Sequence, residues 1–133
     1  MDHKYVYKPY NKDFGPLNLS HLTQYILDMR RLVRENNMAG GRDPTSKIII
    51  HHCSALSMYQ ANASVLMGAY AIFDMWYTAE EAYKLFAKKK ARLAPYQDAG
   101  RVPTGFGVQV NDCLKALERA RLSGWYNPST FDW

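Results

Sequence analysis

The sequence predicts an α/β domain in which a small central sheet is flanked by about four helices. Ile48, Ile49 and Ile50 form a run of β-branched residues that is too short for a helix and typical of a strand buried on both faces. The apolar residues 61–76 that follow have the length of a helix and contain few helix breakers. Because the chain has 133 residues, the size of one domain, we expect a single domain over residues 1–133.

The segment before the strand is expected to be an extended arm followed by a helix. Residues 5–17 are rich in Tyr, Pro and Asn, show no sustained period and reach a turn at Gly15 and Pro16. From Asn18 or Ser20 as the N-cap, apolar residues recur at helical spacing until residues 37–41 end the pattern. The apolar positions of this helix are Leu22, Tyr25, Ile26, Met29, Leu32 and Val33.

Two further helices are expected after the central one. Thr78 and Glu81 have the spacing of a capping box, in which the two side chains bond each other's backbone amides, and this predicts a helix from Ala79 to about Lys90. Gly124 is expected to end the last helix. The apolar positions that predict this last helix are Phe106, Val110, Cys113, Leu114 and Leu117.

The remaining segments are expected to pack around these elements. A strand buried on both faces needs neighbours, so residues 5–7 and part of residues 94–102 are the predicted places for additional short strands. The tail, residues 125–133, is dense in large aromatic side chains. Such a density of exposed aromatics is an aggregation hazard, so we expect the tail to pack back on the domain or to continue into another part of the protein.

The charge of the chain does not require an anionic partner. It carries 17 basic and 12 acidic residues, a formal net charge of +5. The one dense basic patch falls in the last turns of a predicted helix, where cations complement the helix dipole, and no aromatic residues interleave it. We therefore interpret it as a solvated helix end and expect no nucleic-acid partner. The patch consists of Lys84, Lys88, Lys89, Lys90 and Arg92.

Cysteine content and hydropathy indicate the compartment. Cys53 and Cys113 lie far apart in the sequence, and the first ten residues are not an apolar signal run. This favours a reduced protein of the cytoplasm, the nucleus or both. The polar residues Asn62, Ser64 and Asp74 interrupt the longest apolar run, so we expect no membrane span.

The passage from the predicted strand into the central helix has the skeleton of the phosphate-binding loop of cysteine-dependent phosphatases. His52 and Cys53 stand at its start, and Cys53 is the only candidate nucleophile in this context. A working loop needs an Arg six residues after the Cys to grip two phosphate oxygens at once, and that position is Tyr59. Leu56 and Gln60 replace the Gly and the hydroxyl of such a loop. We interpret His52, Cys53 and Tyr59 as a vestigial site without catalytic residues.

Other polar residues give weaker signals. His51 and His52 are adjacent, so in a strand they point to opposite faces and cannot share a metal; we expect no metal and no cofactor. His51 or His52 is expected to be a hydrogen-bonded core residue, and Cys113 to pack in the core. Asp98 is expected to cap a turn rather than act as a catalytic carboxylate. Three aspartates, none in a recognisable acid motif, are the candidate general acids: Asp13, Asp28 and Asp43.

Several motifs occur in an order that resembles a known family. They are Asp13-Phe14-Gly15-Pro16-Leu17-Asn18-Leu19, Ala61-Asn62-Ala63, Gly68-Ala69-Tyr70, Tyr96-Gln97-Asp98-Ala99, Asp112-Cys113-Leu114 and Phe131-Asp132. The chain resembles the N-terminal, dual-specificity-phosphatase-like domain of the cell-division-cycle-fourteen phosphatases. The resemblance implies a protein-tyrosine-phosphatase-like fold without catalytic residues, which packs against a second, catalytic domain of the same parent chain.

The resemblance also implies a function. The expected role is that of a non-catalytic scaffold and substrate-groove domain of a tandem-domain protein phosphatase that acts on cell-cycle phosphoproteins. Its implied partners are the catalytic domain and the phosphoprotein substrate. The alternative is a free-standing small cysteine phosphatase, or a phosphate-binding pseudophosphatase, that uses Cys53.

Overall fold

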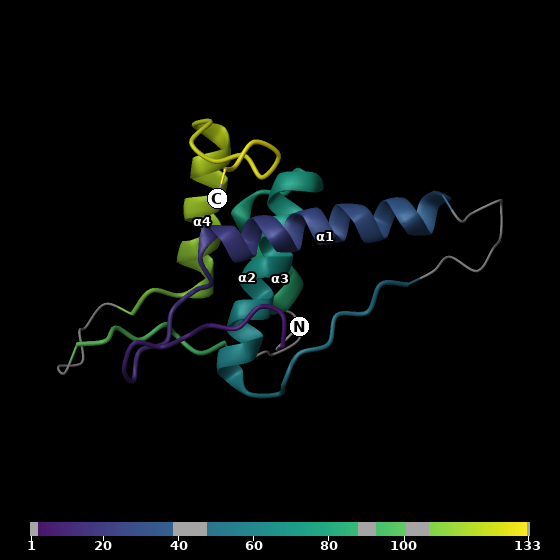
Figure 1. Cartoon of the computed structure of the whole chain (residues 1–133). Coiled ribbons are helices and arrows are strands. Elements are labelled where there is room, and N and C mark those ends of the chain that lie inside the picture. Colours follow the sequence, from purple (N-terminus) through teal and green to yellow (C-terminus); the bar gives the residue numbers. More distant parts are fainter. Residues whose placement is uncertain (1–2, 39–47, 88–92, 101–106, 133) are drawn as a thin grey trace.

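The computed structural model describes residues 3–38, 48–87, 93–100 and 107–132. It contains the helices α1 (Leu19–Met38), α2 (Ser57–Asp74), α3 (Ala79–Ala87) and α4 (Val110–Leu122). In Figure 1, α1 lies across α2, and the N-terminal arm runs beside the segment that precedes α4. None of the described helices is long and apolar enough to cross a membrane.

The predicted central sheet is wrong, and with it the α/β class and the protein-tyrosine-phosphatase-like architecture. Within the described ranges the structure has four helices and no strand; its one β-type pairing is an isolated bridge between Phe14 and Gln97. Ile48 and Ile50 are 82% and 83% exposed, and only Ile49 packs partly against the core. β-Branched residues favour an extended backbone, but a strand also needs a neighbour to accept its hydrogen bonds.

The places predicted for additional strands contribute only that bridge. The backbone N–H of Phe14 donates to the carbonyl of Gln97 at 2.9 Å, and the N–H of Gln97 donates back at 2.7 Å. A separate bond, from the N–H of Tyr96 to the carbonyl of Val108 at 2.8 Å, joins residues 93–100 to the start of the segment that leads into α4 and does not involve the arm. Residues 5–7 form no strand. The arm is therefore held to the segment before α4 by backbone pairing over a very short length.

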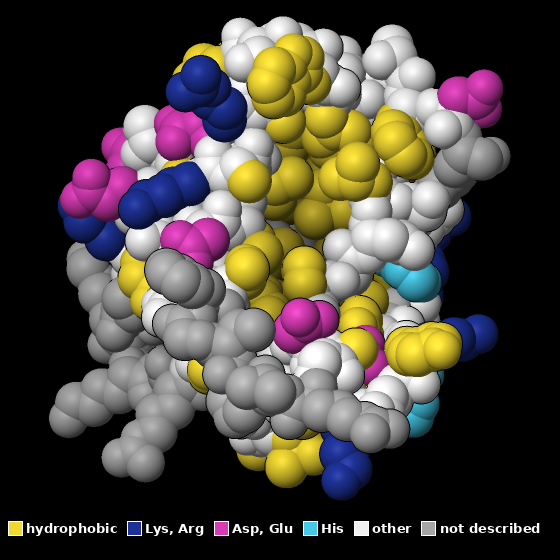
Figure 2. All heavy atoms as spheres, turned by 90° about the vertical axis from the view of Figure 1, so that its left-hand side faces the viewer, with side chains coloured by type: hydrophobic (Ala, Val, Ile, Leu, Met, Phe, Trp, Pro, Cys, Tyr) yellow, Lys and Arg dark blue, Asp and Glu magenta, His cyan; other side chains and the backbone are white. Residues whose placement is uncertain are grey.

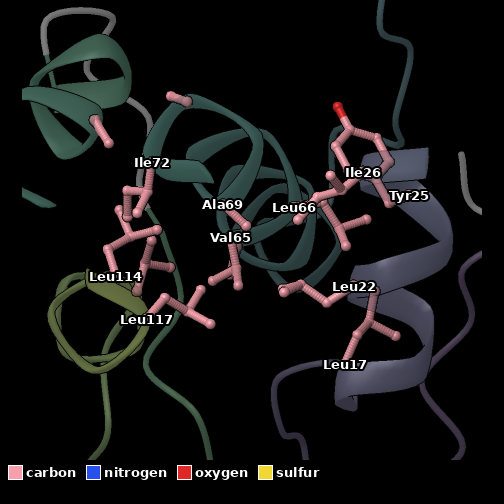
Figure 3. Packing of buried hydrophobic residues seen from close by; sticks show 14 of the residues in the cluster. Leu17, Leu22, Tyr25, Ile26, Val65, Leu66, Ala69, Ile72, Leu114 and Leu117 are labelled. Atoms are coloured by element: carbon pink, nitrogen blue, oxygen red, sulfur yellow. The ribbon is translucent and has the colours of Figure 1, made fainter. Parts of the chain in front are cut away.

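Helix α2 is the centre of the core. It begins at Ser57 rather than at residue 61, ends at Asp74, and contacts each of the other three helices. Side chains of α2 pack between helices: Figure 3 shows α1 on one side of α2 and α4 on the other, with side chains from all three interdigitating. The α2 residues concerned are Val65, Leu66, Ala69 and Ile72.

Gly68 permits the close approach of α2 and α4. A Cβ atom built on this glycine would lie 2.5 Å from Cδ2 of Leu114, a side chain with no exposed surface. Because Leu114 is enclosed by the core, it has little room to move away. The spacing of the two helices thus depends on the absence of a side chain at position 68.

The helix ends agree with the sequence signals. Asn18 caps α1 through its Oδ1, which accepts the N–H of His21 at 2.9 Å. The capping box at Thr78 is confirmed: the N–H of Glu81 donates to the Thr78 hydroxyl at 3.2 Å, and the N–H of Thr78 donates to Glu81 at 2.8 Å. Gly124 follows α4 with a φ of +69°, a conformation that favours glycine.

The aromatic tail packs back on the domain in part. Tyr126 is buried, its hydroxyl lies 2.6 Å from Oγ1 of Thr23 on α1, and its ring meets Phe73 of α2 edge-on. Arg30 joins the same three elements, because its Nε lies 2.6 Å from Asp74 and its Nη1 donates to Ser129 at 2.8 Å. The tail therefore fastens α1 to α2.

Substitution of Gly68 by Ala tests the spacing of α2 and α4. The added methyl group should destabilise the fold by about 1–3 kcal/mol through overpacking, which outweighs the helix propensity gained, about 1 kcal/mol. Gly107→Ala is the matched control, because its nearest neighbour outside the adjoining residues, Cβ of Pro95, lies at an ordinary 3.5 Å. Urea unfolding of the three proteins measures the difference; equal stability of the two variants would contradict the packing described.

Substitution of Tyr126 by Phe tests the fastening of the tail. The Thr23 hydroxyl already donates to the carbonyl of Leu19 at 2.8 Å, so the Tyr126 hydroxyl is the donor in their shared bond. Its removal should cost about 1 kcal/mol, the usual net value of a buried hydrogen bond. Tyr10→Phe, at a position 94% exposed, should change the midpoint of thermal unfolding very little.

Candidate functional site

The segment predicted as a phosphate-binding loop runs without regular secondary structure from His51 into the start of α2. Cys53 is half-buried, whereas His52 is exposed. Tyr59 lies in the first turn of α2 and is 39% exposed. Of the three parts of the skeleton, the loop and the helix are present and the strand is absent.

The start of α2 offers little to a phosphate group. A guanidinium six residues after the Cys would contribute two charge-assisted hydrogen bonds, and the phenol of Tyr59 cannot supply the charge. Gln60 is already part of the helix, since its N–H donates to the carbonyl of Leu56 at 3.1 Å and its carbonyl accepts the hydroxyl of Ser64 at 2.8 Å. No side chain caps α2 at Leu56, whose own side chain is exposed.

His51 lies where a hydrogen-bonded core histidine was expected. Its Nε2 is 3.2 Å from the hydroxyl of Tyr25 on α1, and the two rings pack with centroids 5.6 Å apart. Burial lowers the pKa of His51, because removal from water disfavours the charged imidazolium. His51 therefore belongs to the packing between α1 and the loop.

A cavity of about 190 Å³ adjoins Tyr59, between the N-terminal arm and the first half of α2. We call it the arm–α2 cavity. Its aromatic walls are Tyr5, Tyr7 and Phe14 from the arm and Tyr59 from α2. The sequence alone did not predict this cavity, because it exists only when the arm folds over α2. The one local signal was the spacing of Tyr5 and Tyr7, since side chains two positions apart in an extended segment share a face.

The arm–α2 cavity has an ionised carboxylate in its wall. The hydroxyl of Tyr7 donates to Oδ2 of Asp13, and the backbone N–H of Asn11 donates to Oδ1 at 2.6 Å. The bond from Tyr7, with that from Asn11, lowers the pKa of Asp13, so this carboxylate is negative at neutral pH. A negative wall repels a phosphate dianion.

The two candidate general acids that lie in the described part of the chain are engaged by residues of the arm. Asp13 is engaged with Tyr7 in the arm–α2 cavity, and Asp28 on α1 accepts bonds from Lys4 and from the Tyr5 hydroxyl. Asp43 lies outside the described residues. Asp98 caps its own turn, as expected, by accepting the N–H of Ala99 at 2.7 Å.

The remaining titratable groups fit structural roles. Cys113 is half-buried against the core, and burial raises the pKa of its thiol to about 11, so it is protonated at neutral pH. Lys84 of the basic patch lies 2.6 Å from Glu80 on the exposed face of α3; residues 88–92 are outside the described ranges. No group of three or more His, Cys, Asp or Glu side chains in the described part of the chain could hold a metal ion.

Comparison with known proteins assigns the chain to a protein family. A family model described as the N-terminal half of dual specificity protein phosphatases matches residues 1–120. The chain belongs to this family. The family membership predicted from the sequence motifs is therefore confirmed. The sheet expected with this family is absent from the described residues.

The similar curated proteins are phosphatases of the CDC14 group. Dual specificity protein phosphatase CDC14AB of Danio rerio is 35% identical over 132 residues, which are 98% of this chain and 21% of the relative. Dual specificity protein phosphatase CDC14A of Mus musculus is 30% identical over 133 residues, 99% of this chain and 21% of the relative. The Tyrosine-protein phosphatase CDC14 homolog of Schizosaccharomyces pombe is 27% identical over 132 residues, 99% of this chain and 24% of the relative.

The chain spans about a fifth of the length of the first relatives, and the family match is to an N-terminal half. The part of the family represented here is thus the N-terminal domain of CDC14-type phosphatases.

The buried position of His51 gives a pH prediction. Folding lowers the pKa of His51 from its unfolded value of about 6.5. Between the two pKa values the unfolded chain binds more protons than the folded chain. Stability therefore decreases as the pH is lowered, by at most about 1.4 kcal/mol per pH unit. Urea unfolding at pH 7.5 and 5.5 measures this loss. It should be smaller in His51→Gln than in the wild type and unchanged in the matched control His52→Gln. The other ionisable side chains that line a cleft with His51 include Lys4, Asp28, Arg31 and His52.

Proposed function

We propose that the chain is a non-catalytic scaffold and substrate-groove domain of a tandem-domain phosphatase. The chemistry is assigned to a catalytic domain elsewhere in the same parent chain, and the substrates to phosphoproteins of the cell cycle. The proposed compartment is the cytoplasm, the nucleus or both, in keeping with two cysteines placed far apart in the sequence.

The observation that carries the proposal is the chemistry at the start of α2. Tyr59 stands where a cysteine phosphatase needs its Arg, and transition-state electrostatics are usually the largest contribution to such catalysis. Next to it, the arm–α2 cavity presents the ionised Asp13 rather than a cation. A site of this charge disfavours both the substrate phosphate and the charge that develops in the transition state.

The surface supports a role beside another domain. Figure 2 shows hydrophobic side chains gathered over a broad, hollowed area on the face that looks left in Figure 1. Two large side chains are strongly exposed, since 77% of Trp76 and 80% of Trp125 are accessible. Monomeric proteins rarely leave extended apolar areas uncovered, whereas interdomain surfaces carry them.

The activity of the isolated chain tests the non-catalytic assignment. With para-nitrophenyl phosphate as substrate, we expect no turnover above that of buffer at neutral pH, and no change on Cys53→Ser. The physical reason is the missing guanidinium, whose loss costs orders of magnitude where electrostatic stabilisation dominates. Turnover that disappears in a folded Cys53→Ser variant would instead support the alternative enzyme that uses Cys53.

A binding experiment tests the domain role separately. The 133-residue chain, mixed with the separately expressed catalytic half of its parent protein, should co-migrate in sedimentation velocity as a one-to-one complex. Trp125→Ser and Trp76→Ser each remove a large exposed ring and serve to locate the contact; the matched control is Tyr10→Ser, an exposed aromatic on the arm. Absence of a complex at high micromolar concentration would contradict the scaffold role.

A further inference from the structure

The arm–α2 cavity has a chemistry that neither the family assignment nor the scaffold role uses. Four aromatic side chains and one ionised carboxylate line a space of about 190 Å³. For comparison, an engineered apolar cavity of about 150 Å³ is large enough to bind benzene. The arm–α2 cavity is therefore large enough for a small ligand group.

The hydroxyls of Tyr5 and Tyr7 in its walls have only acceptor capacity left. The hydrogen of the Tyr5 hydroxyl is donated to Oδ2 of Asp28 at 2.5 Å, and that of Tyr7 to Oδ2 of Asp13. Each bond to a carboxylate draws the hydroxyl hydrogen away and leaves the oxygen lone pairs available. A ligand in contact with these oxygens meets acceptors, which suits a positively charged group.

No cationic side chain of the described residues lines the cavity. Its lining is completed by apolar residues and by the buried amide of Asn62, whose Oδ1 accepts the hydroxyl of Tyr96 at 3.1 Å. Among the described residues, the cation over the ring of a wall residue is Lys4, with Nζ 5.5 Å from the Tyr5 centroid; Lys4 is paired with Asp28 and is not part of the lining.

We propose that the arm–α2 cavity binds a methylated ammonium group, held by the rings of Tyr5, Tyr7, Phe14 and Tyr59 and by the negative charge of Asp13. Aromatic faces attract quaternary ammonium groups through the ring quadrupole, and this attraction grows as water is removed. A methylated ammonium has few or no N–H groups, so it does not need a hydrogen-bond acceptor opposite each of its substituents. Inorganic phosphate is excluded by the same carboxylate.

Two sources could supply this group, a free metabolite and a methylated lysine of a partner protein. Choline represents the first and a short peptide containing trimethyl-lysine represents the second. The neutral carbon analogue of choline, 3,3-dimethylbutan-1-ol, has nearly the same shape without the charge. The 133-residue chain is titrated with each of the three compounds, and binding is followed by the chemical shifts of the tyrosine rings. Choline against its neutral analogue measures the contribution of the charge, and choline against the peptide distinguishes the two sources.

Variants at position 59 locate the binding. Tyr59→Ala removes one ring from a partly exposed position in the first turn of α2 and should weaken binding by about fivefold or more, as expected for the loss of a cation–π contact of about 1 kcal/mol. Tyr59→Phe keeps the ring and should bind nearly as the wild type does. Tyr10→Ala is the matched control, because Tyr10 is an exposed aromatic of the same arm that does not line the cavity.

The expected result is saturable binding of choline, of the trimethyl-lysine peptide or of both, with the neutral analogue weaker by about tenfold or more. Inorganic phosphate should not compete. Equal binding of choline and its neutral analogue would overturn the proposal, as would equal losses in Tyr59→Ala and Tyr10→Ala. Absence of saturable binding of both cations up to about 50 mM, in a chain whose unfolding shows it to be folded, would also overturn it. None of these outcomes depends on the phosphatase assignment.

Discussion

The close approach of α2 to its neighbours is the constraint on which the structure depends. The face of α2 toward α4 includes Gly68, and a side chain there would collide with Leu114. Small residues at Ala61, Ala63 and Ala69 likewise keep the helix narrow where other elements cover it. Since α1 contacts no described helix other than α2, its position is set by α2 and by the segments that cross it.

Those crossing segments also determine the chemistry of the surface. The arm is fixed to α1 by Tyr5 and Lys4 at Asp28, and to the segment before α4 by the bridge between Phe14 and Gln97. Each of these contacts uses a carboxylate or a pair of backbone groups. Together the contacts place tyrosine rings over the start of α2. The result is a region rich in acceptors at the position where an active phosphatase concentrates donors and positive charge.

The helices could be predicted because their signals are local. Asn18 and the pair Thr78 and Glu81 mark helix starts in the sequence itself, and the structure places the corresponding hydrogen bonds there. The strand at Ile48, Ile49 and Ile50 could not be decided in this way, because the same residues favour an extended backbone whether or not a partner strand exists. The candidate site shows the same contrast between local and long-range signals. The vestigial character of the loop follows from single positions such as Tyr59, whereas the cavity requires the folded-over arm, a long-range arrangement without a local signature.

The bond between Thr23 and Tyr126 joins residues separated by 103 positions, and this separation has a consequence for the order of assembly. Helices α2, α3 and α4 contact one another, and α1 contacts α2. Helix α1 is made first on the ribosome, yet the ring and hydroxyl that fasten it belong to the last part of the chain. During synthesis, α1 can therefore pack on α2 first, and it gains the fastening through Tyr126 only when the segment after α4 emerges. Until then, this helix lacks one of its fastenings and is less protected against chaperones and proteases than it is in the finished domain.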